Sequence, residues 1–182
     1  MPLRLSREDR AALRGDLGPA VRLAMAVIVR MAELHDAPAL MDITGAHVDG
    51  TLYVGEAGLE FAEHLVRLGA RVAVPTTSNV SGVDEAHWRE WAVPESWARQ
   101  AQRQMAAYQR MGCLPTWTCA PYHTAMRPIF GQQIAWGESN AIVFANSVIG
   151  ARTERYPDFL DICCAITGRV PKRRLPREPR RR

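Results

Sequence analysis

Four segments of the chain group side chains that could do chemistry. In the first, Pro75 is followed by the hydrogen-bonding run Thr76-Thr77-Ser78-Asn79. Hydroxyls, amides and backbone N–H groups all donate hydrogen bonds, so this run could form a cup for a carboxylate or a phosphate. Ser and Asn also favour turns in which they bond their own backbone, so a capped turn is the alternative interpretation.

The second segment holds a histidine flanked by glycines. His47 lies between Gly45 and Gly50, and Thr51 follows. Glycine lets a backbone approach a ligand closely, and an imidazole can bind an anion or move a proton near neutral pH. A lone loop histidine without a function is the alternative.

The third and fourth segments carry a thiol and an acid. Cys119 lies two residues before Pro121, at the exit of an expected strand, where it could ligate iron. One thiolate cannot hold an iron–sulfur cluster, which usually takes three or four cysteines. Glu138 and Ser139 open an expected helix, where the backbone N–H groups and the helix dipole favour a bound anion. The alternative there is simple N-capping by Ser139.

Helices and strands that alternate along the chain should position these residues. Periodicity, caps and breakers predict helices over 6–14, 19–34, 59–68, 94–111, 139–148 and 159–166, and strands over 39–43, 71–74, 113–118 and 134–136. The stretch 44–58, with four glycines, is predicted to be a loop. The order strand, loop, helix, strand implies a parallel crossover, hence an α/β fold of parallel-sheet layers with flanking helices. Ligands in such folds gather past the carboxyl ends of the strands, which here are followed by 47–53 and 75–84.

Composition limits the class of protein. The chain has 182 residues, 47% of them hydrophobic and 23% charged, which fits one globular domain. The longest apolar stretch is far shorter than the roughly 20 residues that cross a bilayer, and no signal peptide precedes the first helix. We therefore expect a cytoplasmic protein without membrane contact.

The positive charge is concentrated at the carboxyl end. Residues 172–182 hold seven Lys or Arg and one Glu, a local charge of +6, so the formal +4 of the chain leaves −2 for residues 1–171. The basic tail lacks the interleaved aromatic residues that stack on bases. We expect no nucleic-acid partner.

Taken together, the segments resemble the large subunit or large domain of the aconitase X family. The strings that carry the resemblance are Gly45-Ala46-His47-Val48-Asp49-Gly50, Val74-Pro75-Thr76-Thr77-Ser78-Asn79, Thr118-Cys119-Ala120-Pro121-Tyr122, Ile134-Ala135-Trp136-Gly137-Glu138-Ser139-Asn140-Ala141 and Ala145-Asn146-Ser147-Val148-Ile149-Gly150-Ala151-Arg152-Thr153. The resemblance implies an aconitase-like fold, incomplete here, over residues 1–171.

The resemblance also implies a hydro-lyase of a small hydroxy acid. The first choice of substrate is cis-3-hydroxy-L-proline, converted to 1-pyrroline-2-carboxylate, and phosphomevalonate is the alternative. An iron or iron–sulfur centre would act as Lewis acid on the departing hydroxyl while a base removes the proton beside the carboxylate. By resemblance, the metal ligand is Cys119, the catalytic residues are Glu138 and Ser139, and the substrate-binding residues are His47, Gly50, Thr51, Ser78 and Asn79.

The resemblance further implies parts that this sequence does not contain. Members of the family continue beyond Gly168-Arg169-Val170-Pro171, where they supply further cysteine ligands and a lysine, and a small swivelling subunit or domain closes the site. The tail 172–182, almost entirely Arg, Lys and Pro, is expected to be disordered or read out of frame. A truncated, non-catalytic binding protein that keeps the anion cup without the metal is the alternative to an enzyme.

Overall fold

The structure is a computed structural model in which residues 3–124 and 126–172 are described. The predicted basic tail therefore lies outside the described residues, except for Lys172. The helices are α1 (Arg7–Arg14), α2 (Pro19–Leu34), α3 (Glu56–Arg67), α4 (Glu95–Arg110), α5 (Ser139–Phe144) and α6 (Leu160–Thr167), with a 3-10 turn η1 (Pro121–His123) and a π-helical turn η2 (Ala145–Ile149). The strands are β1 (Leu40–Asp42), β2 (Ala46–Val48), β3 (Thr76–Ser78), β4 (Ala135–Trp136) and β5 (Arg169–Pro171).

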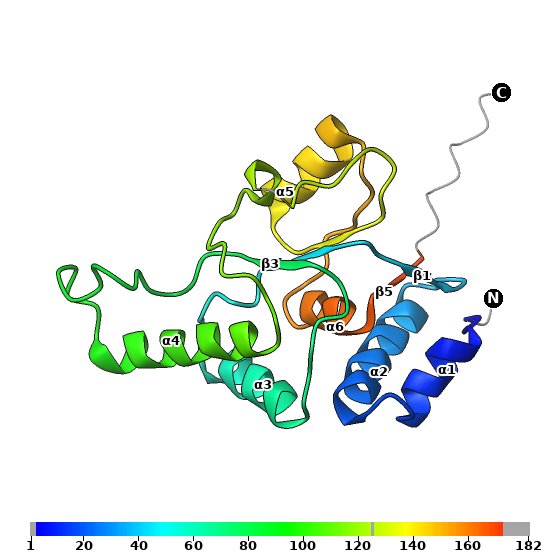
Figure 1. The fold of residues 1–182 in the computed structure, drawn as a ribbon, viewed down its shortest axis with the longest axis horizontal. Coiled ribbons are helices and arrows are strands. Elements are labelled where there is room, and N and C mark those ends of the chain that lie inside the picture. Colours follow the sequence, from blue (N-terminus) through cyan, green and yellow to red (C-terminus); the bar gives the residue numbers. More distant parts are fainter. Residues whose placement is uncertain (1–2, 125, 173–182) are drawn as a thin grey trace.

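A small parallel sheet lies at the centre of the molecule. Its strand order is β3-β2-β4, and β2 pairs in parallel with both neighbours. The connection from β2 through α3 to β3 is a parallel crossover around the predicted helix, but the sequence had predicted it between strands 39–43 and 71–74 instead. Figure 1 shows α5 on one side of this sheet and α6, α3 and α4 on the other, so the α/β class with flanking helices is confirmed.

The central strand β2 lies in the stretch predicted to be a loop, and that prediction was wrong. All three residues of β2 are buried. Glycines on both sides of this short segment indicated a loop, but pairing with a strand on each edge overrides such weak local preferences. The predicted strand 39–43 does form, as β1, but it pairs antiparallel with β5 in a separate two-stranded sheet.

Two other strand predictions were displaced or incomplete. Residues 71–74 do not form a strand; the strand begins one residue after Pro75, in the Thr-Thr-Ser run that indicated a polar cup. Pro75 cannot donate to a ladder, which explains the later start. The segment 113–118 contributes only an isolated bridge between Thr77 and Leu114 rather than a third strand. The helix predictions agree with the observed helices to within a few residues.

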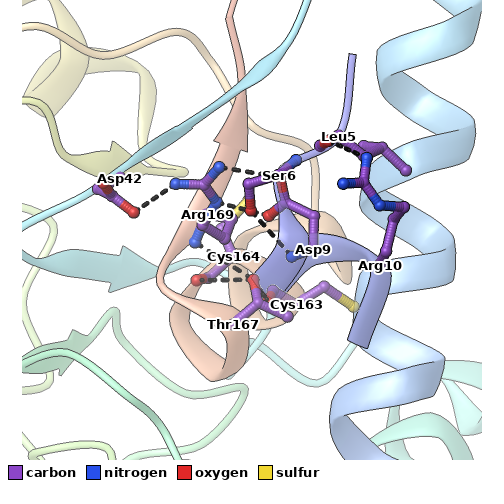
Figure 2. A network of polar contacts seen from close by, with 9 residues as sticks. All are labelled: Leu5, Ser6, Asp9, Arg10, Asp42, Cys163, Cys164, Thr167 and Arg169. Carbon is purple, nitrogen blue, oxygen red and sulfur yellow. Dashed lines mark hydrogen bonds and ion pairs between the residues drawn. The ribbon is translucent and has the colours of Figure 1, made fainter. Parts of the chain in front are cut away.

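The first helix is tied to the last strand by a network of polar contacts (Figure 2). Ser6 and Asp9 form a reciprocal capping box at the start of α1. The same Asp9 carboxylate accepts two hydrogen bonds from the Arg169 guanidinium, at 2.9 and 3.0 Å. Arg169 also pairs with Asp42 of β1. These contacts join α1, β1 and β5 around a nearly buried ion pair.

The largest core cluster lies between α2, α6 and the central strand. It includes Ile28, Leu65, Met111, Ile162 and Val170 among its buried side chains. The eight residues of α6 are apolar apart from Asp161 and Thr167, and α6 packs against α2, β2 and β4. No helix in the described part of the chain is long and apolar enough to cross a membrane.

Candidate active site

The candidate site lies where the three parallel strands end. Because β2, β3 and β4 run in the same direction, with Val48 opposite Ser78 and His47 opposite Trp136, their carboxyl ends lie at one edge of the sheet. Ligands of open parallel sheets bind past such an edge. The residues that follow the strands are Asp49 to Thr51, Asn79, and Gly137 with Glu138.

Asn79 connects two of these strand ends. Its side-chain amide donates to the carboxylate of Asp49 and, at 2.8 Å, to Oε2 of Glu138. Its amide oxygen accepts a hydrogen bond from the backbone N–H of Val80 at 2.8 Å, which fixes the direction of the NH₂ group. The buried amide of Asn79 therefore holds the carboxylates of Asp49 and Glu138 side by side.

Glu138 is also the N-cap of α5. Its Oε1 accepts a hydrogen bond from the backbone N–H of Ser139 at 2.9 Å. The capping interpretation had named Ser139, but the residue at the cap is Glu138. Since both carboxylate oxygens accept hydrogen bonds, the orientation of the Glu138 side chain is fixed.

The loop after β2 is held from two sides. From α6, Oδ2 of Asp161 accepts hydrogen bonds from the backbone N–H groups of Asp49, at 2.6 Å, and Gly50, at 3.4 Å. From α4, the side-chain amide of Gln104 donates to the backbone oxygen of Gly50 at 2.6 Å. The Thr51 hydroxyl donates to the backbone oxygen of Asn79 at 2.9 Å. Gly50, Thr51 and Asn79, predicted separately, thus lie together.

Cys119 lies beside the two carboxylates. Burial, Glu138 and Asp49 raise the pKa of its thiol, while hydrogen bonds from the backbone of Val80 and the side chain of Asn79 act in the opposite direction. The raised pKa means that the free thiol is protonated near neutral pH. Its half-buried side chain is accessible enough to meet a ligand.

The other three cysteines do not join Cys119. Cys113, Cys163 and Cys164 are free and buried in the core, and burial raises the pKa of each thiol. Within the described residues no group of three or more His, Cys, Asp or Glu side chains could hold a metal ion. An iron–sulfur cluster needs more thiolates than this site offers. The residues present therefore do not by themselves fit a cluster.

Two of the predicted substrate-binding residues lie inside the sheet. His47 is 0% exposed, its Nδ1 is 2.8 Å from the hydroxyl of Thr77, and its ring meets Trp136 edge-on. Burial lowers the pKa of His47 to about 4, so the imidazole is neutral at physiological pH. The hydroxyl of Ser78 is likewise buried and has no hydrogen-bond partner in the part of the chain that the structure describes.

Ser139 and Arg155 lie at the exposed rim of the site. The Ser139 hydroxyl accepts a hydrogen bond from Nε of Arg155 at 3.0 Å. A bridge between Arg155 and Trp136 places this cation at the end of β4. A guanidinium beside two carboxylates can bind the carboxylate of a substrate.

Sequence reasoning did not identify Asp49, Gln104, Arg155 or Asp161. Asp161 is a single acid in an otherwise apolar helical run, and such an acid inside a core face indicates a buried interaction. Gln104 similarly lies on the buried face of α4. These two signals were present in the sequence, whereas nothing local distinguished Asp49 or Arg155.

A cleft of about 470 Å³ lies along the chain that follows Asn79, and neither Asp49, Cys119 nor Glu138 lines it. Its lining includes Val80, which follows Asn79, and Trp117, which lies two residues before Cys119. A molecule of the size of a small hydroxy acid would fit into this volume.

The chain is similar in sequence to a known family domain and to proteins named as dehydratases. The sequence model described as "Aconitase X first domain" matches residues 2–175. The cis-3-hydroxy-L-proline dehydratases of Pseudomonas aeruginosa and Hypocrea jecorina are 53% and 50% identical to this chain over 92% and 94% of its length. The phosphomevalonate dehydratase large subunit of Methanothermobacter thermautotrophicus is 38% identical over 92% of the chain.

The fold has a solved counterpart. The crystal structure of Thermococcus kodakaraensis aconitase X in its holo-form superimposes with a TM-score of 0.81 at 36% identity and covers 92% of this chain. The chain spans 29% of the length of the two hydroxyproline dehydratases, and 43% of that of the phosphomevalonate dehydratase subunit. With its family domain matched over almost the whole sequence, the chain belongs to the aconitase X family.

Proposed function

We propose that this chain forms part of a hydro-lyase that dehydrates a small hydroxy acid. The observation that carries the proposal is the pair of carboxylates, Asp49 and Glu138, that the Asn79 amide holds together beside Cys119 at the carboxyl edge of the sheet. Removal of water from a hydroxy acid needs a base for one proton and an acid for the departing hydroxyl. One carboxylate can take the proton as the base, and a carboxyl group that holds a proton can then give it to the departing hydroxyl.

The substrate proposed is cis-3-hydroxy-L-proline, because relatives with that name share about half of their aligned residues with this chain. The base removes the proton on C2, and the electron pair of that C–H bond forms a C2–C3 double bond. The C3–O bond breaks, and the hydroxyl leaves with a proton as water. Tautomerisation of the resulting enamine gives 1-pyrroline-2-carboxylate.

Glu138 is proposed as the catalytic group that handles a proton. Its two hydrogen bonds, from Asn79 and from the Ser139 backbone, hold it at the mouth of the site. Arg155, paired with the Ser139 hydroxyl, is proposed to bind the substrate carboxylate. Gly50, Thr51 and Asn79 would form the floor of the pocket, while His47 and Ser78 would support it from within the sheet.

An iron centre is proposed on the strength of the family, with Cys119 as one ligand. Further ligands are proposed to come from outside the described residues, among which no three His, Cys, Asp or Glu side chains are grouped to hold a metal ion. A small partner subunit or domain, as the name of the Methanothermobacter relative implies, is proposed to close the site. The cytoplasmic location expected from the sequence stays a prediction.

The experiment is kinetics of enzyme that contains residues 1–171, with cis-3-hydroxy-L-proline as substrate. Glu138→Gln keeps the size of the side chain and removes its charge, so we expect turnover to fall roughly a hundredfold or more. The matched control is Glu90→Gln, which makes the same change on an exposed side chain outside the site. Equal rates for both variants would refute the role of Glu138, and a wild-type enzyme inactive on this substrate would refute the proposed substrate.

Phosphomevalonate is the second candidate substrate, favoured by the 38% identity to the large subunit of a phosphomevalonate dehydratase. The same preparations are assayed with it. A wild-type kcat/KM higher for phosphomevalonate than for hydroxyproline would replace the first proposal by the second. Activity on neither would support the alternative of a non-catalytic binding protein.

A further inference from the structure

Asp161 is the one charged residue in the buried face of α6, and the proposed reaction does not use it. Its side chain is 0% exposed. Burial of a carboxylate without compensation costs several kcal/mol. This carboxylate is compensated by backbone N–H donors: Asp49 and Gly50 donate to Oδ2, and Ile162 donates to Oδ1 at 2.6 Å.

The same oxygen lies against the segment that leads to Glu138. A Cβ added to Gly137 would be 3.0 Å from Oδ2 of Asp161 and 3.0 Å from Cβ of Asp49. Gly137 therefore packs directly on both acids, and its lack of a side chain makes the approach possible. Asp161 thus contacts the backbone after β2 and the backbone after β4.

The surroundings of Asp161 fix these contacts. A Cβ on Gly50 would overlap the hydroxyl of Tyr108, which is fully buried under the loop. Phe159, just before α6, has φ of 74°, an uncommon conformation for a residue with a side chain. A strained residue, two tightly packed glycines and a buried acid meet at one place, and such features cluster around functional sites.

We propose that Asp161 is a positioning residue of the site: its carboxylate fixes the Asp49–Gly50 backbone against Gly137, so that Asp49 and Glu138 meet at Asn79. This inference rests on the proposed dehydratase function. Asp161 does not touch the substrate. It acts through hydrogen bonds to the loop that carries Asp49, and Asp49 in turn meets the Asn79 amide that also binds Glu138.

The variant Asp161→Asn tests whether both carboxylate oxygens of Asp161 must accept hydrogen bonds. An amide has one acceptor oxygen, whereas Asp161 accepts on both oxygens, so the NH₂ group must face either the Asp49 N–H or the Ile162 N–H. The matched control is Asp16→Asn, which makes the same change on an exposed acid between α1 and α2, away from the site. For Asp161→Asn we expect kcat to fall roughly tenfold to a hundredfold while KM changes less than about threefold. For Asp16→Asn we expect kcat within about twofold of wild type.

A second measurement follows the loop itself. The amides of Asp49 and Gly50 should exchange hydrogen at least about tenfold faster in Asp161→Asn than in wild type, while strand amides of β2 keep their rates. A uniform increase over all amides, with kcat unchanged below the melting temperature, would mean that Asp161 only stabilises the fold and would overturn the proposal. Kinetics of Asp161→Asn equal to those of Asp16→Asn would overturn it as well.

Gly137→Ala tests the same contact from the other side if Asp161→Asn does not fold. Its added Cβ presses on Oδ2 of Asp161, so we expect the same loss in kcat and the same faster exchange at Asp49. Normal kcat in Gly137→Ala would refute the proposal. A wild-type enzyme that dehydrates neither substrate would refute the proposed function, and the role of Asp161 in it, whereas an active wild type with unaffected variants would refute the role of Asp161 alone.

Discussion

His47 and Asp161 should give the stability of this protein two opposite dependences on pH. Burial lowers the pKa of His47 from 6.5 to about 4. The unfolded state then binds more protons than the folded state between these values, so this contribution to stability is present above pH 6.5 and is lost as the pH falls toward 4. A shift of this size corresponds to about 3 kcal/mol.

Asp161 acts in the other direction. Burial raises its pKa from 3.8 to about 7, against the effect of the hydrogen bonds from Asp49 and Ile162. Here the folded state binds more protons, so the contribution is present below pH 3.8 and is lost as the pH rises through 7. Its size is about 4 kcal/mol. In the wild type the two effects nearly cancel between pH 4 and 6.5.

Single substitutions should separate the two contributions. His47→Asn keeps an amide near the position of Nδ1 and removes the titration, and Asp161→Asn does the same for the acid. Urea unfolding of both variants and of wild type, followed by circular dichroism at pH steps from 4 to 8, gives the free energy of unfolding. The difference between wild type and His47→Asn should grow by about 3 kcal/mol as the pH rises to 6.5, and that for Asp161→Asn should shrink by about 4 kcal/mol up to pH 7.

The control is His64→Asn, which removes an exposed imidazole from α3. Its difference from wild type over the same pH range gives the baseline for an imidazole outside the core. A constant difference for His47→Asn would show that the buried imidazole takes up a proton as readily in the folded state as in the unfolded state. The burial argument for His47 would then be wrong. A difference that stays constant from pH 4 to 8 for Asp161→Asn would show that the acid is ionised in the folded state over this whole range.

Three further outcomes follow from the structure. Arg169→Ala should cost about 3–5 kcal/mol of unfolding free energy, because it leaves the Asp9 carboxylate buried without its partner, and urea unfolding measures it. Tyr108→Phe should change the unfolding free energy by less than about 1 kcal/mol, since the buried hydroxyl has no partner among the described residues; a larger loss in the same assay would reveal a bond to it. Anaerobic reconstitution with iron and sulfide should leave the isolated chain without a stable cluster, and a stoichiometric cluster that Cys119→Ser abolishes would contradict this.

The helices could be predicted from the sequence because their signals are local. The capping box at Ser6, Pro19 at the start of α2 and the glycine after α1 each act within one turn of the chain. Of the three strands of the parallel sheet only β4 was predicted, within the stretch 134–136. Each has two or three residues, too few to show a period, and β3 consists of polar residues that become buried only because neighbours pair with them.

Part of the candidate site could also be predicted, because some of its residues give local signals in the sequence. Asn79 follows a strand and Glu138 opens a helix, where polar groups are visible in the sequence, whereas Cys119 was chosen at the exit of a strand that does not form. Their partners Asp49 and Asp161 are separated by 112 positions and meet only in the folded chain. Contacts of that range depend on the packing of α6 against β2, which no local pattern encodes.

The glycines show how one signal can carry two physical meanings. Gly50 was interpreted as a position where backbone approaches a ligand, yet its missing side chain is required first by Tyr108 beneath it. Gly137 is required in the same way by Asp161. Each glycine presses the loop at the site onto a buried group of the core, so the position of the carboxylates depends on packing below the site. Substitutions in this lower layer should therefore change turnover without any contact with the substrate.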